Sequence, residues 1–242
     1  GHPVLDPAAF HAFAAATPPL CLLAGTTHDS KRGEDMRARL IGLGHHAAAW
    51  REAVTGWLEA KPEGIAASDA AFVWQTIVGA WPDELEPGDA AGRAAFAGRL
   101  KAYLVKALRE AKARSSWTTP DEAYENTVQA FAAACLEGAV GRALHDFHSR
   151  LLPEGVARSL AQTALRLAMP GIPDIYQGAE LWNLRLVDPD NRHPADFADL
   201  AARLAEPPPD FARAWRRGRV KQFLIQRMLA DRAARPSLYA AG

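Results

Sequence analysis

The sequence lacks several features that mark other classes of protein. Its 28 Lys and Arg residues balance 28 Asp and Glu residues, so the formal net charge is zero. Nucleic-acid-binding and membrane-surface proteins usually carry a basic excess, and we expect neither partner here. No apolar run approaches the roughly 18 residues of a membrane span, and residues 1–3 do not have the pattern of a signal peptide. These absences predict a cytoplasmic protein.

Cysteine is also scarce. Cys21 and Cys135 are the two cysteines of the 242 residues, and each has apolar neighbours in sequence. We expect two reduced thiols in the core instead of a disulfide, as is usual in a reducing compartment. The chain does not begin with Met and stops just after a helical pattern, which suggests a piece of a longer protein.

Most of the chain from about residue 32 to residue 168 is predicted to be helical, because apolar residues recur three and four positions apart. The clearest pattern begins after Asp89 and runs to about Ser115. Its predicted inward positions are Phe96, Leu100, Tyr103, Leu104 and Leu108.

Local signals predict where other helices begin or end. Ser68 is expected to cap one helix, and Pro120 is expected to occupy the first position of another. Residues 154–168 are expected to form a separate helix, which Met169 and Pro170 end.

Two short apolar segments, residues 20–25 and 171–175, are predicted to be strands, the first of them buried. Each precedes a polar cluster, and in a parallel barrel such clusters face one shared cavity. The clusters are separated by roughly 145 residues, whereas an ordinary strand–helix–strand unit needs only about 30. A large helical subdomain is therefore expected between the two strands.

The cluster of His28, Asp29 and Ser30 contains the residue types of a hydrolase triad. Consecutive residues on an extended segment point to opposite sides, so we do not expect these three to form that relay.

Two further polar clusters have a structural interpretation beside a functional one. The pairs His45–His46 and His145/His148 lack partners at metal-ligand spacing, and we interpret them as solvated helix positions. Residues 188–192 are either a turn held by salt bridges or a binding site for a hydroxyl-rich ligand, and both interpretations stay open.

Several stretches together resemble the maltooligosyl trehalose synthase family of the α-amylase superfamily (glycoside hydrolase family 13). The longest is THDSKRGEDMRAR at residues 27–39, which resembles the segment after the seventh barrel strand. The other stretches follow in the same order at residues 75–82, 109–125, 170–182 and 187–192. The match departs at Ser30, where Thr is expected, and at His193, where Arg is expected.

The resemblance implies a mainly α fold: a C-terminal-half fragment of a (β/α)8 barrel containing strands 7 and 8, with a large inserted helical subdomain. The expected segments are residues 1–31 with strand 7, residues 32–152 as the insertion, residues 153–206 with strand 8, and residues 207–242 leading into a C-terminal β-domain.

The resemblance also implies an activity for the parent protein, a (1→4)-α-D-glucan 1-α-D-glucosylmutase of trehalose biosynthesis. This enzyme converts the reducing-end α-1,4 linkage of a maltooligosaccharide to α,α-1,1, without a cofactor or metal. Asp29 matches the third carboxylate, which stabilises the transition state. The matched substrate-binding residues are His28, Lys31, Arg32, Tyr176, Gln177, Glu180, Asp188, Asn191 and Arg192.

The nucleophile and the acid/base residue of the family match no residue of this chain. A retaining mechanism needs both carboxyl groups about 5 Å apart, so the chain alone is expected to be inactive. Two strands cannot close a barrel, and their open edges are expected to permit self-association.

Two alternatives remain open. The first is another hydrolase or transglycosylase of the amylase superfamily, which the linkage of the product would identify. The second is a non-catalytic helical module that binds a glycan or a partner protein. A longer reading frame that encodes further strands upstream would argue against the second alternative.

Overall fold

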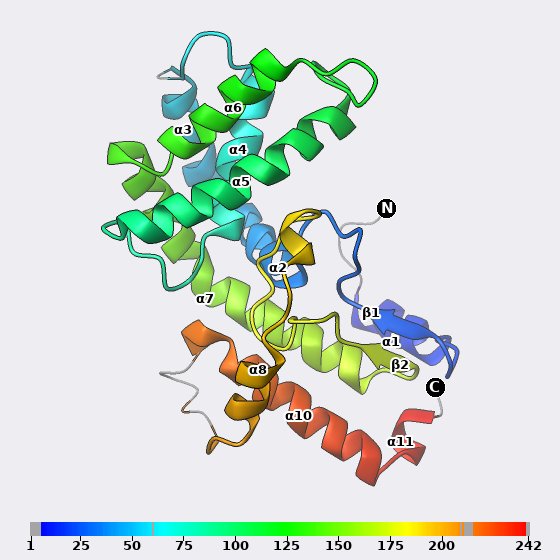
Figure 1. The fold of residues 1–242 in the computed structure, drawn as a ribbon. Coiled ribbons are helices and arrows are strands. Elements are labelled where there is room, and N and C mark those ends of the chain that lie inside the picture. Colours follow the sequence, from blue (N-terminus) through cyan, green and yellow to red (C-terminus); the bar gives the residue numbers. More distant parts are fainter. Residues whose placement is uncertain (1–5, 60, 209, 211–214, 241–242) are drawn as a thin grey trace. The chain divides into compact units, whose positions relative to one another are not determined.

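The fold is mainly α-helical with two short parallel strands (Figure 1). A computed structural model describes residues 6–59, 61–208, 210 and 215–240. The chain divides into two compact units. The first contains residues 1–27, 158–182 and 195–242, and the second contains residues 28–157 and 183–194. The expected division into four segments stays a prediction, and residues 1–3 and 211–214 lie outside the described residues.

The second unit consists of helices. In chain order they are α2 (Glu34–Ile41), the 3-10 helix η1 (Gly42–Gly44), α3 (Ala47–Glu59), α4 (Ala67–Ala80), α5 (Ala90–Ala111), α6 (Glu122–Ala134), the first part of α7 (Gly138–Ala168), and the 3-10 helix η2 (Asp190–Arg192). Helix α4 packs against α2, α3 and α6, and α5 packs along α6.

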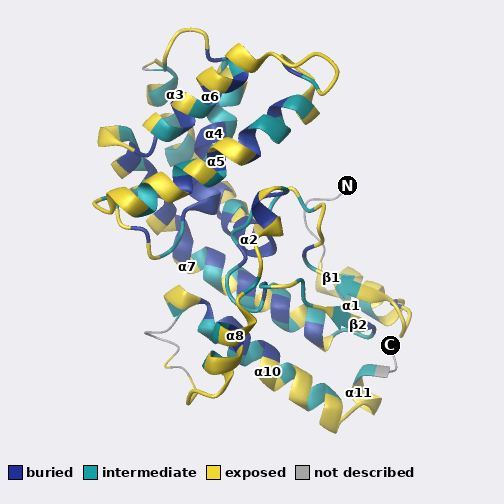
Figure 2. Ribbon diagram, viewed as in Figure 1, coloured by how far each residue is buried: buried dark blue, intermediate teal, exposed yellow. Residues whose placement is uncertain are grey.

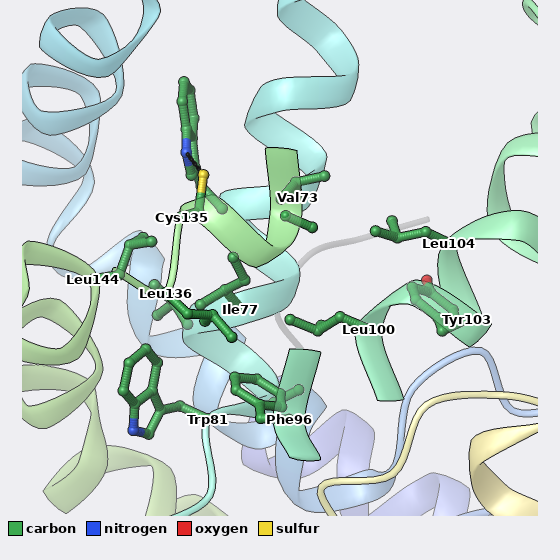
Figure 3. Packing of buried hydrophobic residues seen from close by; sticks show 14 of the residues in the cluster. Val73, Ile77, Trp81, Phe96, Leu100, Tyr103, Leu104, Cys135, Leu136 and Leu144 are labelled. Atoms are coloured by element: carbon green, nitrogen blue, oxygen red, sulfur yellow. Dashed lines mark hydrogen bonds between the residues drawn. The ribbon is translucent and has the colours of Figure 1, made fainter. Parts of the chain in front are cut away.

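The core of the second unit is built around α4 and α5 (Figures 2 and 3). All five predicted inward residues of α5 are buried, which confirms the helical pattern read from the sequence. Trp81, directly after α4, packs edge-on against Phe96 of α5 with ring centroids 5.8 Å apart. The Trp74 indole donates to Cys135 Sγ over 3.3 Å. Burial raises the pKa of this thiol to about 11, despite the hydrogen bond, so Cys135 is the core thiol that the sequence predicts.

The first unit carries the two strands. Its elements are α1 (Pro7–Ala15), β1 (Leu22–Ala24), the end of α7, β2 (Ile172–Asp174), α8 (Phe197–Leu204), the 3-10 helix η3 (Trp215–Arg217), α10 (Arg219–Ala234) and α11 (Ser237–Ala240). Strands β1 and β2 pair in parallel, with Leu22 opposite Ile172. Both predicted strands therefore form, and they are neighbours although most of the chain separates them.

The prediction that the first strand is buried is wrong. Leu22 is 69% exposed and its partner Ile172 is 45% exposed. Burial alternates along both strands: Leu22 and Ile172 lie on the exposed face of the strand pair, while Leu23 and Pro173 are partly buried on the other face. Cys21, next to β1, is exposed as well, which corrects its placement in the core.

Two predicted helix starts are also wrong. Helix α4 begins at Ala67 after an Ala66 cap, so Ser68 lies inside the first turn. Helix α6 begins after Asp121, whose carboxylate accepts from the Tyr124 amide over 2.9 Å. Pro120 therefore precedes the helix, because an Asp side chain satisfies the free amides of the first turn.

The predicted break before residue 154 does not occur, because α7 runs through Pro153. Leu151 and Leu152, just before the proline, are buried. Gly155, just after it, packs so closely on Arg39 that an added Cβ would lie 3.1 Å from the Arg39 Cα. Tertiary packing on both sides of Pro153 thus outweighs the hydrogen bond that its missing N–H removes. Among the described helices, none has both the length and the apolar composition needed to cross a membrane.

Candidate functional site

His28 and Asp29 lie in a turn at the start of the second unit. Their side chains are 81% and 74% exposed, and His28 Nε2 lies 3.2 Å from Asp29 Oδ2. The expectation that these neighbours point to opposite sides is wrong, because the segment turns here and is not extended. Asp29 therefore presents an accessible carboxylate that a neighbouring imidazole contacts.

The segment after Asp29 pairs with the segment that precedes η2. Lys31 O accepts from the Val187 amide over 3.3 Å, and the Gly33 amide donates to Arg185 O over 2.7 Å. Asn191 Nδ2 donates to His28 O over 2.6 Å. These contacts bring the predicted residues His28, Asp29, Lys31 and Arg32 together with Asp188, Asn191 and Arg192. We call the two paired segments, residues 28–33 and 183–192, the site loops.

Ion pairs hold the second site loop. Asp188 Oδ1 lies 2.7 Å from Arg192 Nε, and its Oδ2 lies 3.7 Å from Lys106 Nζ of α5. Salt bridges therefore do hold the turn at residues 188–192. This finding leaves a binding role open, since the Arg192 side chain is 76% exposed.

Asp190 is a buried carboxylate that the sequence reasoning missed. Its two oxygens accept from Arg99 Nε over 2.8 Å and from Arg99 Nη2 over 2.9 Å, and one also accepts from the Leu186 amide over 2.8 Å. Burial raises the pKa of Asp190, but the hydrogen bonds and charge of Arg99 outweigh it, so the pKa lies below its ordinary value. Asp190 shapes the loop that carries Asp188 and Asn191.

Helix α5 also fastens the first site loop. Glu110 Oε2 lies 2.7 Å from Lys31 Nζ, and Glu110 Oε1 lies 3.8 Å from Lys106 Nζ. Tyr103 forms a hydrogen bond with Arg32, yet burial raises the pKa of the phenol. One helix of the predicted insertion thus contacts both site loops.

The three other predicted residues belong to the first unit and follow β2. Tyr176 and Glu180 are half-buried and Gln177 is exposed. The segment forms a turn in which the Ala179 amide donates to Tyr176 O over 2.8 Å. Glu180 Oε2 is buried and has no hydrogen-bond partner within the described part of the chain.

Helix α10 fixes both ends of the β2 segment. Arg232 Nη1 donates to Leu167 O over 2.8 Å and to Met169 O over 2.9 Å, just before the strand. Beyond the strand, the fully buried Lys221 donates to Leu181 O over 3.4 Å. An arginine and a lysine of one helix therefore set the position of the segment that carries Glu180.

No group of three His, Cys, Asp or Glu residues able to hold a metal occurs among the residues described. His45 Nδ1 lies 3.0 Å from Glu154 Oε2. The prediction that His148 is solvated is wrong: it is 2% exposed, with Nδ1 3.3 Å from Arg39 Nη1. Burial lowers the pKa of Arg39, although the carboxylate of Asp83 opposes this. The buried guanidinium needs acceptors, and the His148 ring lies within reach.

No protein-family model matches the chain. A Mycobacterium tuberculosis protein with the provisional name maltooligosyl trehalose synthase is 38% identical over 172 residues, which cover 71% of this chain. The chain matches only 22% of the length of that relative.

The chain is also similar to solved structures of maltooligosyl trehalose synthases. The maltooligosyltrehalose synthase of Arthrobacter ramosus is 36% identical with a TM-score of 0.80, over 97% of this chain and 30% of that one. A second maltooligosyl trehalose synthase is 27% identical with a TM-score of 0.85, over 98% of this chain and 33% of that one. The chain therefore spans a third or less of the proteins that it matches.

Proposed function

Because this chain is homologous to a part of maltooligosyl trehalose synthase, we propose that it forms part of an intramolecular transglycosylase of trehalose biosynthesis. The substrate is a maltooligosaccharide, whose reducing-end α-1,4 linkage becomes α,α-1,1. In this proposal β1 and β2 are the seventh and eighth strands of a (β/α)8 barrel. Residues 32–152 are the inserted helical subdomain.

The proposed role of Asp29 follows from the charge of the reaction. Glycosyl transfer passes through an oxocarbenium-like transition state, and the retaining route needs a nucleophile and an acid/base carboxyl about 5 Å apart. We assign neither role to this chain. A third, accessible carboxylate that binds sugar hydroxyls stabilises the positive charge that develops on the ring. Asp29 provides that carboxylate, and His28 lies 3.2 Å from it.

The pairing of the two site loops is the observation that carries the proposal. It places an exposed carboxylate, an imidazole and the side chains of residues 188–192 on two hydrogen-bonded segments. Sugar hydroxyls are both donors and acceptors, and the exposed guanidinium group of Arg192 suits them. Asn191 is 5% exposed and its amide nitrogen bonds to His28 O, so its proposed part is to position the loop that carries His28. Lys31 and Arg32 of the first site loop are proposed to add further substrate contacts. Tyr176, Gln177 and Glu180 of the first unit stay predicted substrate-binding residues.

The helical insertion is proposed to limit hydrolysis. A glycosyl intermediate reacts with any acceptor that reaches it, and excluding water favours the sugar. Helix α5 contacts both site loops, through Glu110 on one and Lys106 on the other. It is therefore suited to keep both loops closed around a bound glucan.

A segment exchange tests the proposal. This chain replaces the matching segment of the Arthrobacter ramosus enzyme, and maltohexaose is the substrate. We expect loss of reducing ends without release of glucose. Asp29→Asn should lower the rate by about 10²–10³-fold, as loss of a group that stabilises the transition state does. Asp146→Asn, which changes a carboxylate that is 72% exposed, is the control and should not alter the rate.

Equal activity of a folded Asp29→Asn chimera would overturn the proposal. Release of glucose in place of reducing-end loss would identify a hydrolase instead. The 242-residue chain by itself is expected to leave maltohexaose unchanged.

A further inference from the structure

Trp117 is the one tryptophan that is strongly exposed in the described part of the chain. It lies on the loop between α5 and α6, which Figure 2 shows as exposed, and its side chain is 56% exposed. The other tryptophans are buried or partly buried: Trp50, Trp57, Trp74, Trp81, Trp182 and Trp215. Single exposed apolar side chains are common, so exposure alone does not identify a site. The loop around Trp117 supplies the further evidence.

Hydrogen bonds fix this loop on both sides of Trp117. The Ser116 amide donates to Thr119 O over 3.1 Å, and the Thr119 amide donates to Ser116 Oγ over 3.0 Å. The Asp121 amide donates to Ser115 Oγ over 3.0 Å, and that hydroxyl in turn contacts Glu125. The loop is therefore held in one conformation before any ligand binds.

An arginine supports the indole from one side. The Arg109 guanidinium lies 5.2 Å from the centroid of the Trp117 ring. Its Nε and Nη2 donate to the two carboxylate oxygens of Glu125 over 2.7 and 2.8 Å, so its charge is neutralised. The exposed area of Trp117 then belongs to the opposite face and the ring edges. The result is an exposed aromatic side chain backed by a hydrogen-bonded ion pair.

We propose that Trp117 is a stacking platform for one pyranose ring of an α-1,4-glucan, on the helical insertion. The proposal rests on the proposed function, which makes such a glucan the ligand. The face of a pyranose presents C–H groups with a partial positive charge, and the face of an indole is electrostatically negative. Ser116, Thr118 and Thr119 flank Trp117 in the sequence. Ser116 Oγ and Thr118 Oγ1 lie 3.2 Å apart, and a hydroxyl such as that of the exposed Thr119 can bond to a sugar hydroxyl.

A neutral sugar fits this surface better than other ligands do. Arg109 pairs with Glu125, so the charge directly behind the Trp117 ring is compensated and does not favour a charged peptide. The preformed loop also lowers the entropy that binding costs. Helix α5 carries both Arg109 and Glu110, and Glu110 pairs with Lys31 of the first site loop. The same end of α5 therefore contacts both Trp117 and the first site loop. A longer maltooligosaccharide can contact both of them at once, so we expect it to bind more tightly than a short one.

Calorimetric titration of the 242-residue chain with maltoheptaose tests the platform. Trp117→Ala should weaken binding about tenfold or more, as loss of one stacked ring does elsewhere. Trp117→Tyr, which keeps an aromatic face, should retain most of the affinity. Phe197→Ala is the matched control, because Phe197 is an exposed aromatic side chain of the first unit, at 61%. It should leave the affinity unchanged.

Unchanged binding by Trp117→Ala, or no binding of maltoheptaose by the unmodified chain, would overturn the platform. Tighter, Trp117-dependent binding of a proline-rich peptide would overturn the assignment to a sugar. Asp29→Asn should keep the Trp117-dependent binding. The segment-exchange assay tests the proposed function separately, so failure of one proposal is distinguishable from failure of the other.

Discussion

Carboxylates in two different environments carry the chemistry and the stability of the second unit. Asp29 is exposed and free to meet a ligand, whereas Glu125 and Asp190 are buried at 2% and 3% exposure. Burying a carboxylate is costly unless charged hydrogen-bond donors surround it. Arg109 and Arg99 supply two donors each. The buried pairs therefore hold a loop in place, whereas Asp29 has the accessibility that a substrate-binding role requires.

The ionisation of Glu125 is expected to make the stability of the protein depend on pH. The hydrogen bonds from Arg109 hold its pKa below the ordinary value, although burial opposes them. A carboxyl group whose pKa is lower in the folded than in the unfolded state stabilises the protein. This contribution is complete above the unfolded-state pKa of about 4.3, and it is lost as the pH falls through the folded-state pKa. We expect the thermal midpoint to fall in this acid range, and to fall less steeply in Glu125→Gln.

Circular dichroism melts between neutral pH and pH 3 measure this effect. Glu125→Gln should also be less stable at neutral pH, because the amide accepts only part of the hydrogen bonding from Arg109. Glu63→Gln, which changes an exposed carboxylate, should follow the unmodified chain. Parallel melting curves for the unmodified chain and Glu125→Gln would contradict the prediction.

At the scale of elements, α5 links the helical insertion to the chemistry. Its Glu110 contacts Lys31, and its Lys106 contacts Asp188. Glu110→Gln in the segment-exchange enzyme should raise the ratio of glucose to trehalose-ended product by about two- to fivefold, because a half-exposed pair contributes up to about 1 kcal/mol. Chromatography of the products from maltohexaose measures the ratio. Glu63→Gln is the control, and an equal ratio in all three proteins would show that α5 does not restrict water.

The two site loops pack closely against each other at Gly33. A Cβ on Gly33 would lie 2.3 Å from Asn183 O and 2.5 Å from Asn183 Oδ1. Gly33→Ala should therefore cost about 1–3 kcal/mol, as overpacking does, and should increase amide exchange at residues 185–187. Gly56→Ala is the matched control, because α3 leaves open space around that position. It should stabilise the protein by about 0.5–1 kcal/mol, as urea unfolding can measure. Equal effects of the two changes would contradict the proposed close packing.

The elements that the sequence predicts correctly are those that local residues specify. The inward face of α5 repeats over five apolar residues, and both strands lie between clear turn signals. The predictions at Pro153 and Leu22 are wrong, because packing with residues far along the chain decides the outcome there. A proline usually predicts a break in a helix. Nothing near Pro153 in the sequence shows that buried residues on both sides keep α7 continuous.

The same reason limits what could be predicted of the site. The residues of the first site loop form one contiguous motif, so a resemblance finds them together. Arg99 lies 91 residues from Asp190, and Glu110 lies 79 residues from Lys31. No local pattern connects such pairs, and the contribution of α5 therefore becomes evident only in the fold.

At the scale of the whole molecule, the strand pair of the first unit has unpaired edges and an exposed apolar face. Within the residues described, β1 and β2 each pair only with the other, so each has one edge without a strand partner. Leu22 and Ile172 are opposite each other in the register and both exposed. An apolar face next to open strand edges is a template for association with another chain.

We therefore expect the 242-residue chain to self-associate as its concentration rises. Lysine on the exposed face should oppose this through charge repulsion, as lysine on edge strands does in other proteins. Leu22→Lys combined with Ile172→Lys should shift the chain toward monomer in sedimentation velocity. Leu229→Lys, which changes a comparably exposed leucine of α10, is the control and should not. If the unmodified chain is monomeric at every concentration, or if both sets of variants dissociate it equally, the strand pair is not the surface of association.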